Sequence, residues 1–68
     1  MTVGSQVKQT LAGLKSAQAT LKIYSIQSQS AEAQSVFEEA VNTTAEIIEG
    51  IEKRLKVLEL EEPQYKGL

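Results

Sequence analysis

Two charge patterns with the same period strongly constrain the fold of this chain. Lysines recur every seven residues at 8, 15 and 22, and glutamates recur at the same interval at 32, 39 and 46. Seven residues are close to two helical turns, so each set lies along one side of a helix. Pairing the lysines with the glutamates in reverse order gives a constant sum of residue numbers, as expected for two antiparallel helices. The predicted ion pairs are Lys22–Glu32, Lys15–Glu39 and Lys8–Glu46.

The apolar residues support the same hairpin, because they are spaced by three and four as on one side of a helix. In the first half they are Val3, Val7, Leu11, Leu14, Ala17, Leu21 and Tyr24. In the second half the same spacing links Phe37, Val41, Thr44, Ile48, Ile51, Leu55 and Leu58. Reverse pairing places Leu11 opposite Ile48 and Gln18 opposite Val41. The two stripes therefore form one seam between the helices.

Local signals set the expected ends of the helices. The polar Ser28-Gln29-Ser30 cluster separates the two stripes. Ser30 is expected to cap the second helix through its hydroxyl oxygen, and Pro63 to end that helix. We therefore expect an all-α fold, an antiparallel two-helix hairpin in a single domain over residues 1–68. Its parts are a helix at 3–27, a turn at 28–30, a helix at 30–61 and a tail at 62–68.

The small size of the chain predicts self-association. A domain of 68 residues buries little apolar surface, and the chain has neither cysteine nor histidine for a disulfide or a histidine-bound metal. A second copy is the remaining way to stabilise it, so we expect a homo-oligomer, with a dimer of hairpins forming a four-helix bundle as the first choice. The predicted interface residues are Ala12, Ala19, Ile23, Ile26, Val36, Ala40, Ile47 and Val57.

Composition excludes several classes of function. A net charge of −2 and a pI of about 5.0 argue against nucleic-acid binding. No apolar run approaches the length of a membrane span, and the N-terminus lacks the pattern of a signal peptide, so we expect a cytoplasmic protein, or one held in a spore. We expect no enzyme activity, no catalytic, cofactor-binding or metal-binding residue, and no cofactor.

Two features leave an alternative open. Gln18 and Thr44 are polar at seam positions, which favours a polar layer that sets the register of the helices. The alternative is a small-ligand or metal-binding helical bundle that uses these two side chains and the glutamates. The tail also contains Tyr65 and Leu68, which we interpret as a candidate docking segment for a protein partner of unknown identity.

The two ends of the chain carry a family resemblance. The opening MTVGSQVKQTL at residues 1–11 and the ending EEPQYKG at residues 61–67 resemble a family of very small proteins from spore-forming Firmicutes, the domain of unknown function numbered sixteen fifty-seven. The resemblance implies a bacterial spore-former and a sporulation or spore germination context, and it assigns no catalytic residue. We therefore expect a non-enzymatic structural or protein-interaction module that self-associates.

Overall fold

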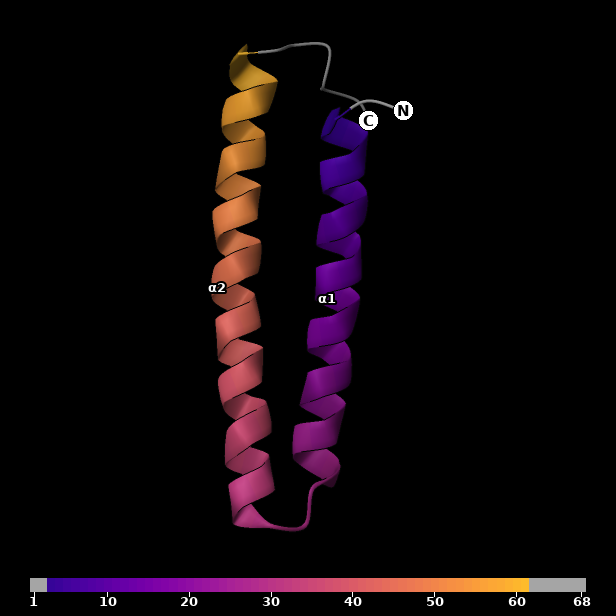
Figure 1. The fold of residues 1–68 in the computed structure, drawn as a ribbon, viewed down its shortest axis with the longest axis vertical. Helices are drawn as coiled ribbons and strands as arrows, with labels where there is room; N and C mark the ends of the chain where they lie inside the picture. The colour runs from indigo at the N-terminus through magenta and orange to yellow at the C-terminus, as the bar shows by residue number, and fades with distance from the viewer. Residues whose placement is uncertain (1–2, 62–68) are drawn as a thin grey trace.

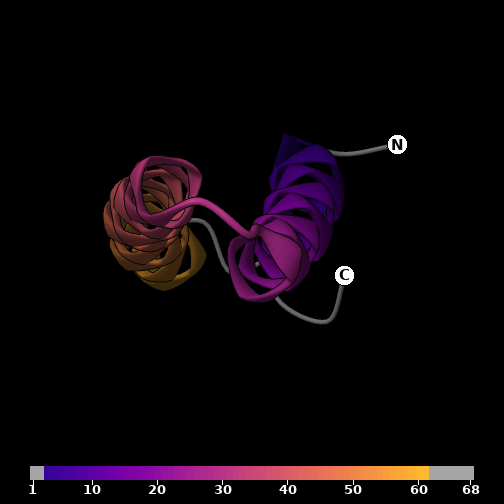
Figure 2. The ribbon, with the colours of Figure 1, turned by 90° about the horizontal axis from the view of Figure 1, so that it is seen from below.

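The computed structural model describes residues 3–61, which form two antiparallel α-helices joined by a short turn (Figure 1). Helix α1 spans Val3–Gln27 and helix α2 spans Ala31–Glu61. The molecule measures 48 × 18 × 12 Å, and the view along the helices shows them lying side by side in a single layer (Figure 2). The predicted all-α hairpin is confirmed, and α2 begins just after the residue at which we expected it to start.

The polar cluster between the helices forms the turn by satisfying their terminal backbone groups. The Ser30 hydroxyl oxygen accepts a hydrogen bond from the Ala33 amide at 3.0 Å, which confirms the predicted cap of α2. On the other side of the turn, the Ser28 hydroxyl donates to the Tyr24 carbonyl at 2.6 Å. The Gln34 side chain then donates to the Ser28 carbonyl at 2.9 Å, which ties the first turn of α2 to the end of α1.

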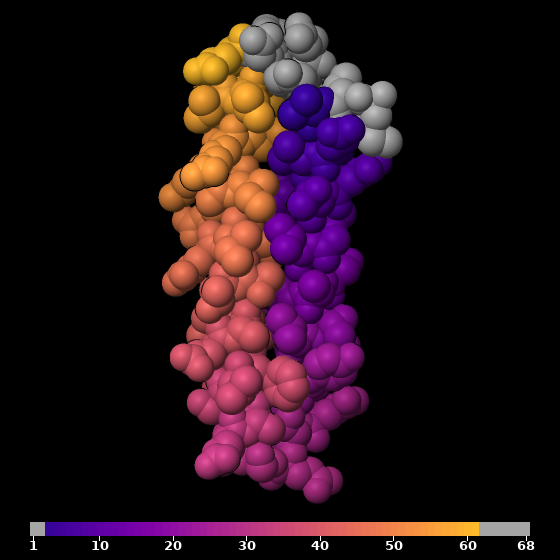
Figure 3. All heavy atoms as spheres, in the orientation of Figure 1, coloured from indigo at the N-terminus to yellow at the C-terminus, as the bar shows by residue number. Residues whose placement is uncertain are grey.

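The core is a thin seam between the helices. Leu11, Ile48 and Leu55 are buried, with exposed fractions of 6, 7 and 9%. Val7, Leu14 and Ile51 pack against them while keeping part of their surface in water. This arrangement confirms the predicted seam at these positions, and the space-filling view shows side chains of both helices meeting along their length (Figure 3). No described side chain is less than 2% exposed, because no further layer of structure covers the seam.

The apolar stripe predicted for α1 is wrong at Val3, Ala17 and Tyr24. All three are exposed, Val3 at 54% and Tyr24 at 49%. Gly4 and Ser25 are buried instead. Every third or fourth residue of α1 faces α2, and some of these residues are small or polar rather than apolar. A pattern of apolar residues alone therefore selected the neighbouring positions.

Candidate functional site

The seam divides the remaining surface into two flanks that differ in charge. We call a residue that faces the other helix an inner residue. Each residue turns about 100° around a helix, so the residue before an inner residue lies on one flank and the residue after it lies on the other. Tyr24 and Ile26, on either side of the buried Ser25, show the rule, because they line two different hollows. The same rule holds along both helices.

The charged flank consists of residues that follow inner residues. Its charged members on α1 and α2 are Lys8, Lys15, Lys22, Glu38, Glu49, Glu52, Lys56 and Glu59. Two ion pairs cross the seam here. The Lys8 ammonium lies 3.5 Å from a Glu59 carboxylate oxygen, and the Lys15 ammonium lies 3.1 Å from one of Glu52. The charged flank is therefore largely neutralised within the chain.

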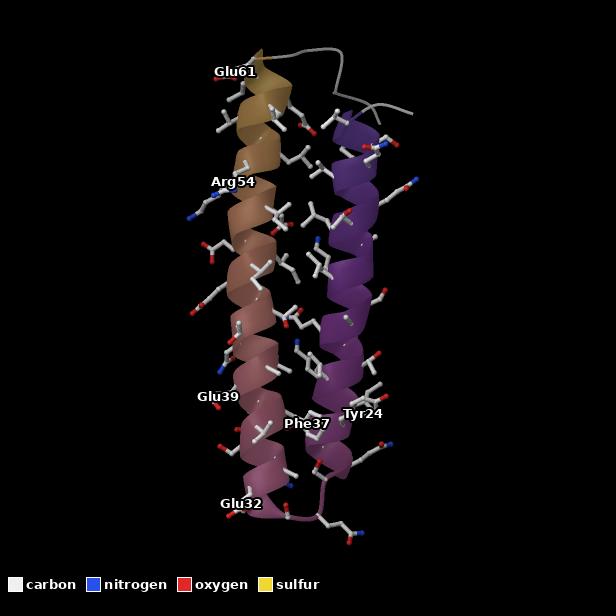
Figure 4. The ribbon with its side chains drawn as sticks, in the orientation of Figure 1. Tyr24, Glu32, Phe37, Glu39, Arg54 and Glu61 are labelled. Atoms are coloured by element: carbon white, nitrogen blue, oxygen red, sulfur yellow. The ribbon has the colours of Figure 1, made fainter. Side chains whose placement is uncertain are left out.

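The predicted pairs of these lysines with Glu32, Glu39 and Glu46 are wrong. Glu32 and Glu39 point away from α1 (Figure 4), and Glu46 shares their seven-residue repeat on the exposed outer side of α2. Side chains lean toward the N-terminus of their own helix, so in an antiparallel pair a lysine of α1 meets a glutamate further along α2. Lys8 therefore pairs with Glu59, and Lys15 with Glu52.

Glutamates also stand four residues before lysines within α2. Glu49 pairs with Lys53 at 3.3 Å, as acid-before-base spacing on a helix favours. Glu52 has the same spacing to Lys56, but its carboxylate binds Lys15 across the seam instead.

The ladder of ion pairs ends at a hollow near the turn. The hollow has a volume of about 320 Å³ and lies between the helices on the charged flank. Its walls are Lys22, Ser25, Ile26, Glu38, Val41 and Asn42. It thus combines one basic group, one acidic group and apolar surface.

The apolar flank consists of residues that precede inner residues. Its apolar members are Val3, Ala17, Tyr24, Val36, Ala40, Ile47 and Val57. The larger ones are well exposed, with Val36 at 61%, Val57 at 52% and Ile47 at 49%. Within residues 3–24 and 36–57, Arg54 is the only charged residue on this flank. This flank therefore offers exposed apolar side chains to a partner, chiefly along α2 from Val36 to Val57.

An aromatic pair sits at the turn end of the apolar flank. The rings of Tyr24 and Phe37 have centroids 5.6 Å apart and planes tilted by 59°. This edge-inclined geometry is favourable for aromatic rings. The two rings, with Gln27 and Ser28, line a shallow second hollow. The pair joins α1 and α2 beyond the aliphatic part of the seam.

The structure distributes the predicted interface residues over three sides of the hairpin. Val36, Ala40, Ile47 and Val57 lie on the apolar flank. Those from α1 differ: Ala12, Ala19 and Ile26 follow inner residues and lie on the charged flank, whereas Ile23 lies on the outer side. Ile23 is two residues, or about 200° around the helix, from both Leu21 and Ser25, so it lies on the side of α1 that faces away from α2. One flat contact cannot cover all eight residues.

The polar seam residues have local partners. The Gln18 amide donates to the Val41 carbonyl at 3.4 Å across the seam, and the Thr44 hydroxyl donates to the Ala40 carbonyl at 2.7 Å within α2. The Gln18 bond fits a polar layer that sets the register of the helices. Within residues 3–61, no group of three acidic side chains is placed to hold a metal ion. Tyr65 and Leu68 lie outside the described residues.

Neither α1 nor α2, over the residues that the structure describes, combines the length and apolar character needed to cross a membrane.

The chain matches a known protein family. The model of a family described as protein of unknown function (DUF1657) matches residues 7–55. The chain belongs to the DUF1657 family. The part that matches DUF1657 begins and ends at the seam residues Val7 and Leu55, so it contains the turn and most of both helices. No curated protein and no solved structure matches the chain.

Proposed function

We propose that this protein is a non-enzymatic structural or interaction module that self-associates through the apolar flank. The observation that carries the proposal is the run of half-exposed aliphatic side chains on that flank, including Val36, Ile47 and Val57. Several exposed apolar side chains on one side of a small protein are typical of protein–protein contacts. The near absence of charge on this flank favours a partner surface that is equally apolar, and a second copy of the same flank meets that condition.

The thin seam gives the hairpin a reason to associate. Three buried aliphatic side chains are a small core for a chain of 68 residues. Complete burial of an aliphatic side chain stabilises a protein by about 1.5–3 kcal/mol. Covering the exposed half of such a side chain therefore contributes about half of that value. Covering Val36, Ile47 and Val57 on two copies therefore adds several kcal/mol to a marginal fold. A dimer of hairpins with these flanks together is a four-helix bundle.

Small residues on the apolar flank favour close approach of a second copy. An added Cβ at Gly13 or Gly50 would meet nothing within 4 Å in the isolated chain. Both glycines precede inner residues and so lie on this flank, Gly13 one helical turn from Ala17 and Gly50 one turn from Ile47. Helix–helix distance depends on the side chains at the contact, and small ones shorten it. A second copy can occupy the space beside these residues.

Paired isoleucine variants test the proposal. Ile47→Glu places a charge on the apolar flank, and Ile23→Glu places the same charge on the outer side of α1. The two isoleucines are 49% and 51% exposed, so they are matched in type and exposure. In size-exclusion chromatography with light scattering, Ile47→Glu is expected to reduce the mass while Ile23→Glu leaves it as in the parent chain. Equal masses for both variants and the parent chain would overturn the proposal.

The cellular context forms part of the proposal. The family resemblance supports a role in sporulation or spore germination, where such a module would hold other proteins together. Immunoblots of vegetative and sporulating cells of the host test this point. A constant level in both states would contradict it without affecting the proposal for the apolar flank.

A further inference from the structure

The ion-pair ladder on the charged flank stops one pair short. Lys8 binds Glu59 and Lys15 binds Glu52, so the same seven-residue step would pair Lys22 with residue 45. That residue is Ala45. Among the described residues, Lys22 has no ion-pair partner, and neither does Glu38. These two groups of opposite charge line the same hollow.

Lys22 and Glu38 lie at the same height along the hairpin. Two side-chain hydrogen bonds fix the register on either side of them. Gln18 donates to the Val41 carbonyl, and Ser25 donates to the Gln34 carbonyl, each at 3.4 Å. Lys22 lies between Gln18 and Ser25 on α1, and Glu38 lies between Gln34 and Val41 on α2. The hollow therefore has a basic wall on α1 and an acidic wall on α2 at one level.

This arrangement is self-complementary under two-fold symmetry. In a symmetric dimer, each contact between different residues occurs twice. A two-fold axis parallel to the helices, passing in front of the charged flank, lays α1 of each copy on α2 of the other at the same height. Lys22 of each copy then faces Glu38 of its partner. Glutamate on both walls, or lysine on both, would instead repel a second copy.

Neighbouring side chains on α1 suit the same contact. Ile26 is 81% exposed at the edge of the hollow, which makes it the most exposed large apolar residue in the described part of the chain. Its seven-residue repeat continues through Ala19 and Ala12, whose small side chains permit a close approach. A second copy over this flank would shield Ile26 from water. Ala19 and Ile26 therefore flank Lys22 along α1 with one small and one exposed aliphatic side chain.

We propose that the hollow on the charged flank binds a second copy of the chain, with Lys22 and Glu38 of each copy forming reciprocal ion pairs. This contact is separate from the one proposed for the apolar flank, because the two flanks lie on opposite sides of the seam. A chain with two self-complementary flanks binds two other copies. Association then continues beyond a dimer.

Charge reversal with mixing tests the contact in the Ile47→Glu background, in which the apolar flank is disabled. Lys22→Glu leaves two acidic groups at the hollow, and Glu38→Lys leaves two basic groups. Each reversal juxtaposes like charges between copies and is expected to weaken association about tenfold or more. An equimolar mixture of the two reversed chains is expected to restore it. Sedimentation velocity over a range of concentrations measures the association, and circular dichroism checks that each variant is folded.

Mixing separates this proposal from an effect within one chain, because an intrachain pair cannot be restored by adding another chain. A mixture that associates no better than its separate components would overturn the proposal. So would an Ile47→Glu chain that is monomeric at every concentration, and that result would leave the apolar-flank proposal standing. Conversely, if Ile47→Glu matches the parent chain in mass while Lys22→Glu lowers it, the charged-flank contact stands and the apolar-flank proposal fails.

Discussion

The two flanks border the same seam, but they differ in whether their side chains find partners within the chain. Those of the charged flank largely do, and those of the apolar flank do not. On the charged flank, Lys8 and Lys15 reach glutamates of α2. On the apolar flank, Val36, Ile47 and Val57 keep about half of their surface in water or more. The difference follows from side-chain length. Lysine and glutamate can reach across the seam, whereas a valine beside it cannot, so apolar flanks need a second surface.

The energies of the two flanks also differ. Ion pairs between exposed side chains contribute about 0–1 kcal/mol each. The side chains of the Lys15–Glu52 pair are 55% and 46% exposed, so this pair lies at the low end. Burying the remainder of an isoleucine contributes about 1 kcal/mol and is not weakened by the charge screening that salt causes. The apolar flank is therefore the stronger candidate for association, and the charged flank sets register and orientation.

Truncation of a seam side chain is expected to have the largest effect on stability, because the positions of both flanks depend on the packing of the seam. Ile48→Ala deletes one of the three buried aliphatic side chains and is expected to destabilise the fold by about 2–5 kcal/mol. Urea unfolding followed by circular dichroism at a fixed protein concentration measures this loss. The matched control is Ile47→Ala on the apolar flank, with a loss of about 1 kcal/mol or less when both variants are measured at a concentration low enough to leave the chain unassociated. Equal losses would show that the seam and the apolar flank are not distinct.

Alanine at the two open glycines tests how closely the apolar flank packs on a second copy. In the isolated chain, Gly13→Ala and Gly50→Ala each meet empty space and should stabilise their helix by about 0.5–1 kcal/mol. If the apolar flank packs closely on a second copy, the added methyl groups reduce that gain as the protein concentration rises. Thermal unfolding at low and high concentration separates these contributions. A gain that is the same at all concentrations would argue against close packing at the glycines.

Completing the ion-pair ladder should make the charged flank more self-contained. Ala45→Glu supplies the glutamate that the seven-residue step lacks opposite Lys22. It is expected to stabilise the hairpin by about 0.2–1 kcal/mol, and the gain should fall in high salt. The same substitution should weaken the contact between charged flanks, because Lys22 then has a partner within its own chain. Urea unfolding in low and high sodium chloride checks the first effect. Unchanged stability would show that Lys22 does not follow the ladder geometry.

The smallest effect is expected for a pair already in place. A double-mutant cycle with Lys15→Met and Glu52→Gln isolates the coupling between these two side chains. The coupling is expected to be about 0.5 kcal/mol or less, since both are about half exposed. Urea unfolding of the four chains at one ionic strength gives the value. A coupling well above 1 kcal/mol would mean that the charged flank contributes as much as the apolar one.

Sequence patterns predicted the architecture closely. The hairpin, the Ser30 cap, the Glu49–Lys53 pair and the seam residues Leu11, Ile48 and Leu55 all follow from helical spacing and local capping. Spacing failed where inner positions hold small or polar residues. Gly4 and Ser25 are buried, and no hydrophobic pattern signals such residues. The eight predicted interface residues lie on three sides of the hairpin, with the α2 residues on one flank and the α1 residues on two other sides.

The helices, the turn and the side of α2 that faces α1 could all be predicted from the sequence. These properties depend on period and capping, which act over a few residues. Which charges meet became clear from the packed helices, because it depends on the direction in which side chains lean in an antiparallel pair. The tertiary structure also showed that the two flanks differ, and that Lys22 and Glu38 share a hollow without pairing. Those facts involve residues far apart in the chain, brought to the same height by the packing of α1 on α2.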